Sequence, residues 1–309
     1  MKNKKIAVVM GGPSDEREVS LNTGRAIFAA LQEKGYQVVA IDIEPERFVD
    51  QIKQSGAEVV FNAIHGKYGE DGIMQGALEL LGIPYTGSGV LASAASMDKG
   101  ISKRLFLAEG VPTPRSVLYS KADRERDLPA EIVKKFSLPL VVKSAAQGSS
   151  IGVTIVETAA ALPEAIQQAF QHSENILVEE FISGKEVTVA VWGNEQPEAL
   201  PIIEIAPHSG RYDYHSKYTK GATDYIVPAR VDETTAAEIR KAAIGAYSVF
   251  GCRGIARADI MLDQAGHPYV LEVNTIPGMT ATSLVPKSAA AAGISFADLC
   301  ERLLLMAGK

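Results

Sequence analysis

The sequence predicts an α/β protein, in which a parallel α/β domain at the N-terminus is followed by an α+β region. In the first hundred residues, short apolar runs of strand length alternate with segments of helical periodicity. This alternation is typical of parallel strands joined by crossover helices. Beyond a stiff connector at Val111–Pro114, the expected strands follow one another more closely, as they do in hairpins.

The N-terminal domain contains three apolar runs that we expect to be buried strands. They are Ile6–Met10, Val38–Ile43 and Val59–Ile64. Helical patterns at about 19–34 and 73–81 separate or follow these runs, and Gly35 and Gly82 stand where a helix would stop. The loops Gly11–Glu18 and His65–Gly72 each follow the carboxyl end of a strand, where open α/β sheets bind ligands.

The second part of the chain, beyond the connector, is preceded by a predicted helix at about 91–109. Its expected strands are Leu138–Lys143, Gly148–Val156, Ile176–Phe181 and Glu186–Trp192, with one helix at about 159–171. The last third contains a polar stretch at 206–224, a helix at about 233–250, a hairpin at 256–274 and a closing helix at about 295–306.

Length, charge and cysteine content restrict the class of protein. A chain of 309 residues is natural for two or three domains. The net charge of −6 argues against a nucleic-acid partner. The first apolar run has five residues, too short for a signal peptide, and no run is long enough to span a membrane. The two cysteines cannot form a disulfide framework, which indicates a reducing compartment, and these features together predict a cytoplasmic protein with no membrane partner.

The hairpin at Arg257–Asn274 predicts a metal site. If its pairing is symmetric, Asp259 faces Glu272 and Arg257 faces Asn274, so that these four side chains share one face. The opposite face would then be core, formed by Ala258, Ile260, Leu262, Tyr269, Leu271 and Val273. Two opposed carboxylates and an amide offer oxygen ligands, which suit a hard cation such as magnesium. The alternative is a solvated face whose charges pair with Arg257.

Two segments suit a nucleotide. Lys143 ends an apolar strand, and the small-residue loop that follows can present backbone N–H groups to phosphate. The strand that runs through Glu179 into the short apolar segment Phe181–Ile182 suits an adenine ring, and a nearby carboxylate could reach ribose hydroxyls. An ordinary flexible hairpin and an exposed acidic strand are the respective alternatives.

Three further features lie in loops. The polar stretch contains Lys217 and Tyr218, and a long loop of this kind is typical of a lid that closes over phosphate. A surface loop packed on its own domain is the alternative. Glu16, before the first long helix, is either a catalytic carboxylate or an acid that complements the helix dipole. His65 either faces a cleft or belongs to a turn.

The order of these segments resembles that of the D-alanine–D-alanine ligase family of the ATP-grasp superfamily, across essentially the whole chain. The similar segments are Gly11–Ser20, His65–Gly72, Met97–Lys99, Lys143–Gly152, Glu179–Glu186, Tyr212–Tyr218, Gly254–Asp259 and Glu272–Leu284. The resemblance implies a Rossmann-like N-terminal substrate domain at 1–98 and a two-lobed ATP-grasp fold. Its central subdomain would be 99–190, and its C-terminal subdomain, with the lid and the metal site, would be 191–309.

The resemblance implies ATP-dependent joining of two D-alanine molecules through a D-alanyl phosphate. ATP would be held by Lys99, Lys143, Glu179 (through its backbone), Phe181, Ile182, Glu186 and Lys217. Two Mg²⁺ or Mn²⁺ ions would be held by Asp259, Glu272 and Asn274, with Glu272 bridging.

The resemblance also assigns the substrate residues. Glu16, in a cluster with Ser149 and Tyr218, would bind the amino group of the first D-alanine, and His65 would also bind substrate. Arg257 and the Gly278 backbone would stabilise the oxyanion, and Ser283 and Leu284 would bind the second D-alanine. A homodimer is implied. The alternatives are a ligase for another carboxylate and nucleophile, such as D-lactate, and a non-catalytic nucleotide-binding regulator.

Overall fold

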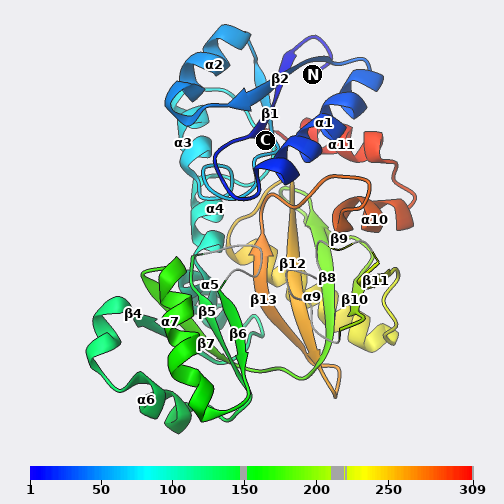
Figure 1. The fold of residues 1–309 in the computed structure, drawn as a ribbon. Coiled ribbons are helices and arrows are strands. Elements are labelled where there is room, and N and C mark those ends of the chain that lie inside the picture. Colours follow the sequence, from blue (N-terminus) through cyan, green and yellow to red (C-terminus); the bar gives the residue numbers. More distant parts are fainter. Residues whose placement is uncertain (147–151, 210–218, 220, 308–309) are drawn as a thin grey trace.

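The structure is a computed structural model in which residues 1–146, 152–209, 219 and 221–307 are described. Its strands form three sheets, one in each of three lobes (Figure 1). The N-terminal lobe is joined to a lobe around the central sheet and to a lobe around the C-terminal sheet, and the last two lie beside each other (Figure 1).

The N-terminal lobe is a parallel sheet with helices on both faces. Its elements are β1 (Lys5–Gly11), α1 (Arg17–Glu33), β2 (Gln37–Ile43), α2 (Phe48–Ser55), β3 (Val59–Asn62) and α3 (Ile73–Leu80). The strand order is β2-β1-β3, and both pairings are parallel, as predicted. Side chains alternate along β1, because Ile6 and Val8 pack with α1, whereas Ala7 and Val9 pack with α2 and α3.

The prediction of one helix at about 91–109 was wrong. The structure has two helices there, α4 (Val90–Met97) and α5 (Lys99–Ala108), separated by Asp98. Asp98 has an extended backbone, and its side chain accepts a hydrogen bond from the Ile101 N–H at 2.9 Å. An aspartate in this position caps the start of a helix, so α5 begins anew at Lys99.

The central sheet is antiparallel and carries two helices on one face. Its elements are β4 (Ser116–Ser120), α6 (Leu128–Lys135), β5 (Leu140–Ser144), β6 (Val153–Val156), α7 (Leu162–His172) and β7 (Asn175–Glu180), in the strand order β4-β7-β5-β6. Leu140 and Val142 pack against the helices, whereas Val141 and Lys143 point to the other face. The expected strand 148–156 begins, in the part described, at Val153.

The C-terminal sheet is antiparallel, with one long helix behind it. Its strands are β8 (Gly184–Trp192), β9 (Glu198–Ala199), β10 (Ile203–Pro207), β11 (Thr223–Ile226), β12 (Ile255–Asp263) and β13 (Pro268–Asn274). The order is β11-β10-β8-β12-β13, with β9 beside β8. Helix α9 (Glu233–Val249) covers one face, and α10 (Leu284–Ala291) and α11 (Phe296–Met306) return to the N-terminal lobe, where α11 packs on α1 (Figure 1).

The polar stretch expected at 206–224 has a β-strand at each of its two ends. Strand β10 extends to Pro207, and β11 begins at Thr223 and pairs with it. Backbone pairing gives these ends a conformation that the polar side chains did not indicate. Residues 210–218 and 220, with Lys217 and Tyr218, lie outside the described part of the chain.

The hairpin β12–β13 has the predicted register at one end only. Arg257 faces Asn274 and Asp259 faces Glu272, as expected, but the register then shifts and Ile260 faces Val270. This shift is a β-bulge that leaves one extra residue on β13, and such a bulge reverses the side-chain alternation beyond it. The prediction that Tyr269 and Leu271 belong to the core was therefore wrong. Val270 is buried there instead, and Leu271 lines a pocket on the opposite face.

Candidate functional site

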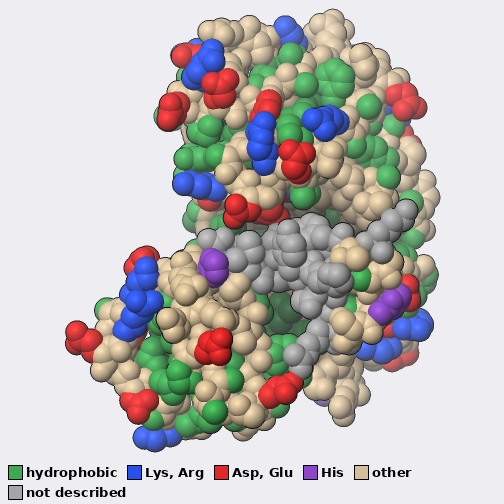
Figure 2. All heavy atoms as spheres, viewed as in Figure 1, with side chains coloured by type: hydrophobic (Ala, Val, Ile, Leu, Met, Phe, Trp, Pro, Cys, Tyr) green, Lys and Arg blue, Asp and Glu red, His purple; other side chains and the backbone are tan. Residues whose placement is uncertain are grey.

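A cavity of about 210 Å³ lies between the central sheet and the C-terminal sheet. In each sheet, one face is covered by helices and the other face lines the cavity. The space-filling view shows a hollow between the two lobes, with hydrophobic side chains in its wall (Figure 2). The predicted site residues that line it are Lys99, Lys143, Glu179, Phe181, Ile182, Glu186, Arg257, Asp259, Glu272 and Leu284. Segments far apart in the sequence thus meet in one pocket.

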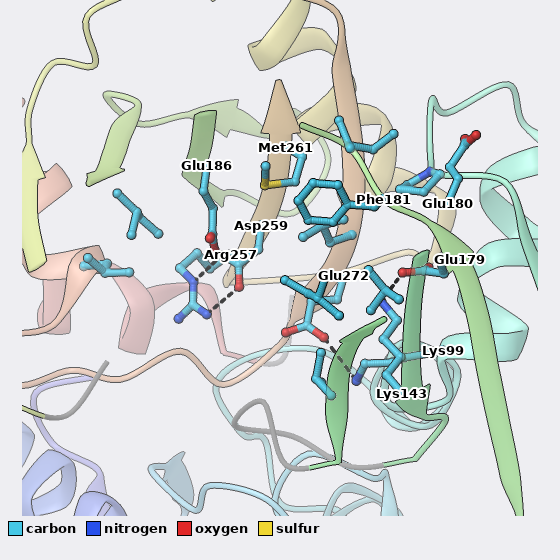
Figure 3. A pocket seen from close by; sticks show the side chains of 18 residues that line it. Lys99, Lys143, Glu179, Glu180, Phe181, Glu186, Arg257, Asp259, Met261 and Glu272 are labelled. Atoms are coloured by element: carbon cyan, nitrogen blue, oxygen red, sulfur yellow. Dashed lines mark hydrogen bonds and ion pairs between the residues drawn. The ribbon is translucent and has the colours of Figure 1, made fainter. Parts of the chain in front are cut away.

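One end of this inter-sheet pocket is apolar. Phe181 and Met261 lie close to the chain segment that links the two lobes (Figure 3), and the pocket lining also includes Ile182 and Leu271. Apolar walls from two sheets suit a flat ring, and the exposed edge of such a ring can hydrogen-bond to backbone groups. This end of the pocket therefore has the character expected of an adenine site.

The other end of the pocket contains buried charges on the central sheet. The Lys143 ammonium lies 2.5 Å from one Glu179 carboxylate oxygen, and the Lys103 ammonium lies 2.6 Å from the other. Burial alone would raise the pKa of Glu179, but the two ammonium groups outweigh it and hold the pKa below its ordinary value. Glu179 is therefore an ionised carboxylate between two lysines, one of which faces the pocket.

The predicted metal ligands share one face of the hairpin. Asp259 receives a bidentate contact from Arg257, at 2.9 and 2.8 Å, and a hydrogen bond from the Thr188 hydroxyl at 2.6 Å. Glu272 lies 3.1 Å from the Lys99 ammonium (Figure 3). Each of the two carboxylates is thus balanced by a cationic side chain, and the pairing of Asp259 with Arg257 is the one that the alternative to a metal site expected.

These side chains suit a divalent cation by their chemistry. The described residues contain no group of three or more His, Cys, Asp and Glu placed to hold a metal. The hairpin instead offers two carboxylates and the Asn274 amide, whose oxygen accepts a hydrogen bond from the Ile276 N–H at 3.0 Å and keeps a second lone pair. An all-oxygen set is the set that magnesium and manganese prefer.

His65 is more enclosed than a cleft histidine would be. It is 3% exposed, its Nε2 lies 3.0 Å from the Thr23 hydroxyl, and its Nδ1 lies 3.6 Å from a Glu70 oxygen. The Thr23 hydroxyl also accepts, at 3.5 Å, from the N–H of Met279. His65 therefore joins helix α1, its own loop and the loop after β13.

The position of Glu16 argues against a purely capping role. It is the N-cap residue of α1, all of which is described, and its side chain makes no capping hydrogen bond there. A Cβ atom added to Gly66 would lie 3.2 Å from a Glu16 carboxylate oxygen, so this carboxylate rests against the His65 loop. Both loops expected at the carboxyl ends of β1 and β3 thus meet at Glu16.

The loop after β13 brings Ser283 back against Gly278. The Ser283 hydroxyl accepts from the Thr280 N–H at 3.0 Å, and a Cβ atom at Gly278 would lie 2.9 Å from it. Position 278 thus has little room for a side chain. Ser283 is the N-cap of α10, and the next residue, Leu284, reaches the inter-sheet pocket.

Of the remaining predicted residues, Ser149, Lys217 and Tyr218 lie outside the described part of the chain.

Two polar residues of the site were missed in the sequence. Thr188 is neighbour to Asp259 on β8 and gave no signal, because the pairing of β8 with β12 is a tertiary fact. Lys103 had a signal, since it follows Lys99 by four residues and both therefore lie on one face of α5. That face also carries Phe106, so a lysine on it is directed into the interior.

The chain matches family models over most of its length. Residues 5–57 and 46–88 match the model described as D-ala D-ala ligase N-terminus, and residues 105–305 match D-ala D-ala ligase C-terminus. A curated D-alanine–D-alanine ligase of Pelotomaculum thermopropionicum is 48% identical over 307 residues, which cover 98% of this chain and 96% of that protein.

Solved structures share the fold over nearly the whole chain. A crystal structure of D-alanine–D-alanine ligase from Bacillus anthracis complexed with ATP has a TM-score of 0.85 and 36% identity, covering 98% of this chain and 97% of that one. The VanG D-Ala:D-Ser ligase from Enterococcus faecalis has a TM-score of 0.84 and 32% identity, covering 98% and 99%. The predicted fold class, a Rossmann-like domain followed by a two-lobed ATP-grasp fold, is thereby confirmed, and the chain belongs to the D-alanine–D-alanine ligase family.

Proposed function

We propose that this protein is an ATP-dependent ligase that joins two D-alanine molecules into D-alanyl-D-alanine, a precursor of peptidoglycan. The observation that carries the proposal is the inter-sheet pocket, in which an apolar ring site, buried lysines and two opposed carboxylates occur together. Membership of the family supports the same activity.

The nucleotide would lie along this pocket. Phe181 and Ile182 would enclose the adenine, the backbone of Glu179 would meet its edge, and Glu186 would face the ribose. The phosphates would then point toward Lys99 and Lys143. Lys217, which lies outside the described residues, would close over the γ-phosphate.

Two Mg²⁺ or Mn²⁺ ions would be held by Asp259, Glu272 and Asn274, with Glu272 shared. Such ions neutralise phosphate oxygens and orient them for transfer. Lys99 now contacts Glu272, so it would be released toward the phosphates where a cation takes its place. Thr188 holds Asp259 through a hydroxyl donor and would keep one of its oxygens in a fixed direction.

The reaction would take place in two steps. A carboxylate oxygen of the first D-alanine attacks the γ-phosphorus of ATP, which gives D-alanyl phosphate and ADP. The amine of the second D-alanine then attacks the carbonyl carbon, loses a proton, and phosphate leaves. Arg257, fixed by its two contacts with Asp259, and the N–H of Gly278 would donate to the oxygen that becomes negative.

The substrates would lie beyond the phosphates, toward the N-terminal lobe. Glu16, with Ser149 and Tyr218, would bind the first amino group, and His65 would fix the surrounding loops. Ser283 and the Leu284 backbone would bind the carboxylate of the second D-alanine.

Assembly and location belong to the same proposal. We expect domain boundaries near 98 and 190, a cytoplasmic protein, and a homodimer. In the described residues, no helix is both long and apolar enough to cross a membrane. Consecutive helices α3, α4 and α5 lie along one side of the molecule and expose Ile73, Leu80, Leu91 and Leu107 (Figure 1). Such a surface suits contact between two copies.

The test is product formation with competing nucleophiles. The protein is incubated with D-alanine, ATP and magnesium, together with D-serine and D-lactate, and products are separated by mass while phosphate is followed. D-alanyl-D-alanine is expected to predominate. The second candidate function is the joining of D-alanine to D-serine, because one structural relative is a D-Ala:D-Ser ligase. A predominance of D-alanyl-D-serine would favour that function. ATP turnover without any dipeptide or ester would overturn the ligase proposal.

A further inference from the structure

Helix α5 directs two lysines into the interior, and only one of them lines the inter-sheet pocket. Lys99 contacts Glu272, whereas Lys103, one turn later, lies behind the pocket wall and is 3% exposed. Charged side chains are rarely buried to this degree unless they are paired. The interior position of Lys103 therefore needs a reason.

The Lys103 ammonium lies where three parts of the chain meet. It is 2.6 Å from Glu179 on β7, 2.6 Å from the Thr113 hydroxyl in the connector, and 3.5 Å from the carbonyl oxygen of Val270 on β13. The same carbonyl accepts from the Thr113 hydroxyl at 2.7 Å, and the Val270 N–H donates to Pro112 at 2.8 Å. Lys103 is thus tied to both sheets that form the pocket.

Glu179 stands between Lys103 and Lys143. Each ammonium approaches a different carboxylate oxygen, so the three groups form a line from behind the wall to the pocket. Burial lowers the pKa of Lys103 to about 8, and Lys103 therefore remains mostly protonated at pH 7. With both lysines protonated and Glu179 ionised, this line of charges has a net single positive charge.

We propose that Lys103 is a positioning residue for nucleotide phosphate, which acts by sharing the charge of Glu179 so that Lys143 keeps its own for the ligand. Without Lys103, the carboxylate would be balanced by Lys143 alone, and the pair would present no net charge to phosphate. The inference rests on the proposed function, because it takes the ligand to be ATP.

A double-mutant cycle separates this role from simple packing. Lys103→Met removes one positive charge and leaves a neutral pair, whereas Lys103→Met with Glu179→Gln restores the original net charge beside the pocket. Backbone groups of residue 179 are unchanged in both variants. Binding of a non-hydrolysable ATP analogue with magnesium is measured by calorimetry, and binding of adenosine, which lacks phosphate, is measured by displacement.

The affinities of the variants for the ATP analogue are expected to follow the net charge beside the pocket. Lys103→Met weakens binding of the ATP analogue by about tenfold or more, and adding Glu179→Gln recovers most of that loss, since a buried pair removed together costs less than one partner removed alone. Adenosine binding stays within about twofold throughout. Lys134→Met, at an exposed position of α6, is the matched control and leaves both affinities unchanged.

Several outcomes would overturn the inference. A double variant that binds the analogue no better than Lys103→Met, or an equal loss for adenosine, would assign Lys103 to packing alone. Lys103→Gln, which keeps a hydrogen-bond donor and removes the charge, must give the same order and serves if Lys103→Met does not fold. Failure of the unaltered protein to bind the analogue would instead contradict the proposed function.

Discussion

Asp259 and Glu272 illustrate how single residues carry the proposed chemistry. They face each other across two antiparallel strands, so their carboxylates lie on one face beside Asn274. Asp259 is balanced by Arg257 on its own strand, and Glu272 is balanced by Lys99 from helix α5. Removing a charge at Glu272 should therefore affect the ligand site more than the fold.

Glu272→Gln is expected to lower turnover by at least about 100-fold, because a neutral amide is a poor ligand for a shared divalent cation. Phosphate release from D-alanine and ATP measures turnover, and the melting temperature checks that the fold survives. The control is Glu238→Gln, on the exposed side of α9. Near-normal turnover of a folded Glu272→Gln protein would remove the metal assignment.

Glu70 gives a pH dependence of stability. Burial raises the pKa of this carboxyl above its ordinary value, and the nearby charge of Glu16 adds to the increase, although the contact with His65 opposes it. The folded protein thus retains a proton that the unfolded chain releases above about pH 4.5. The contribution of this proton to the free energy of unfolding is fully present below that pH, and it is lost as the pH rises through the pKa of Glu70 in the folded protein.

Glu70→Gln, which stays neutral, should therefore gain stability relative to the unaltered protein as the pH is raised from 5 to 8. Urea unfolding at both pH values measures the difference in the free energy of unfolding. Glu33→Gln, at an exposed position at the end of α1, should change the free energy of unfolding by the same amount at both pH values. A difference for Glu70→Gln that does not change with pH would contradict a raised pKa of Glu70 in the folded protein.

At the scale of elements, two helical glycines make opposite predictions. A Cβ atom at Gly24 of α1 would lie 2.5 Å from the Cβ of Met10 on β1, so the helix packs on the sheet at a distance that only glycine allows. At Gly76 of α3 the nearest atom to such a Cβ would be a Val90 methyl at 3.9 Å. The first glycine is required by packing, and the second is not.

Gly24→Ala is therefore expected to lower the free energy of unfolding by about 1–3 kcal/mol, the usual result of overpacking. Gly76→Ala should raise it by about 0.5–1 kcal/mol, because alanine favours the helix. Denaturant unfolding of both variants under one condition gives the comparison. Equal effects of the two substitutions would show that α1 can move away from β1 without loss.

For the whole molecule, the first and last parts of the chain form one core. Residues of β1 and α1 pack together with α10 and α11, and α11 lies against α1. The C-terminal helices therefore fix the N-terminal lobe to the C-terminal sheet, next to the Ser283 loop. The exposed side of α3, α4 and α5 remains the surface on which we expect a second copy.

Leu91→Lys should weaken that association, because Leu91 is 78% exposed and a charge would be buried between the copies. Sedimentation equilibrium is expected to give about twice the chain mass of 32.9 kDa for the unaltered protein and a lower mass for the variant. Leu305→Lys, on α11, should leave the mass unchanged. An unaltered protein that is monomeric would contradict the proposed dimer.

The sequence by itself determined the features that depend on local pattern. Apolar runs located β1 and β2 to within one residue at each end and covered all of β3, and alternation along the hairpin paired Asp259 with Glu272. These predictions succeeded because strand alternation and helical periodicity are short-range properties. The break at Asp98 was also local, since an aspartate cap marks it, but the apolar pattern on both sides concealed it.

Only the tertiary structure decided which surfaces meet. The bulge beside Asp259 reversed the positions of Val270 and Leu271, because a register shift depends on how two strands fit together. Thr188 reached Asp259 because β8 pairs with β12, and Lys103 met Glu179 because α5 lies behind the central sheet. Such contacts join residues more than 70 positions apart. They form only when the chain has folded, so a pattern of neighbouring residues in the sequence cannot predict them.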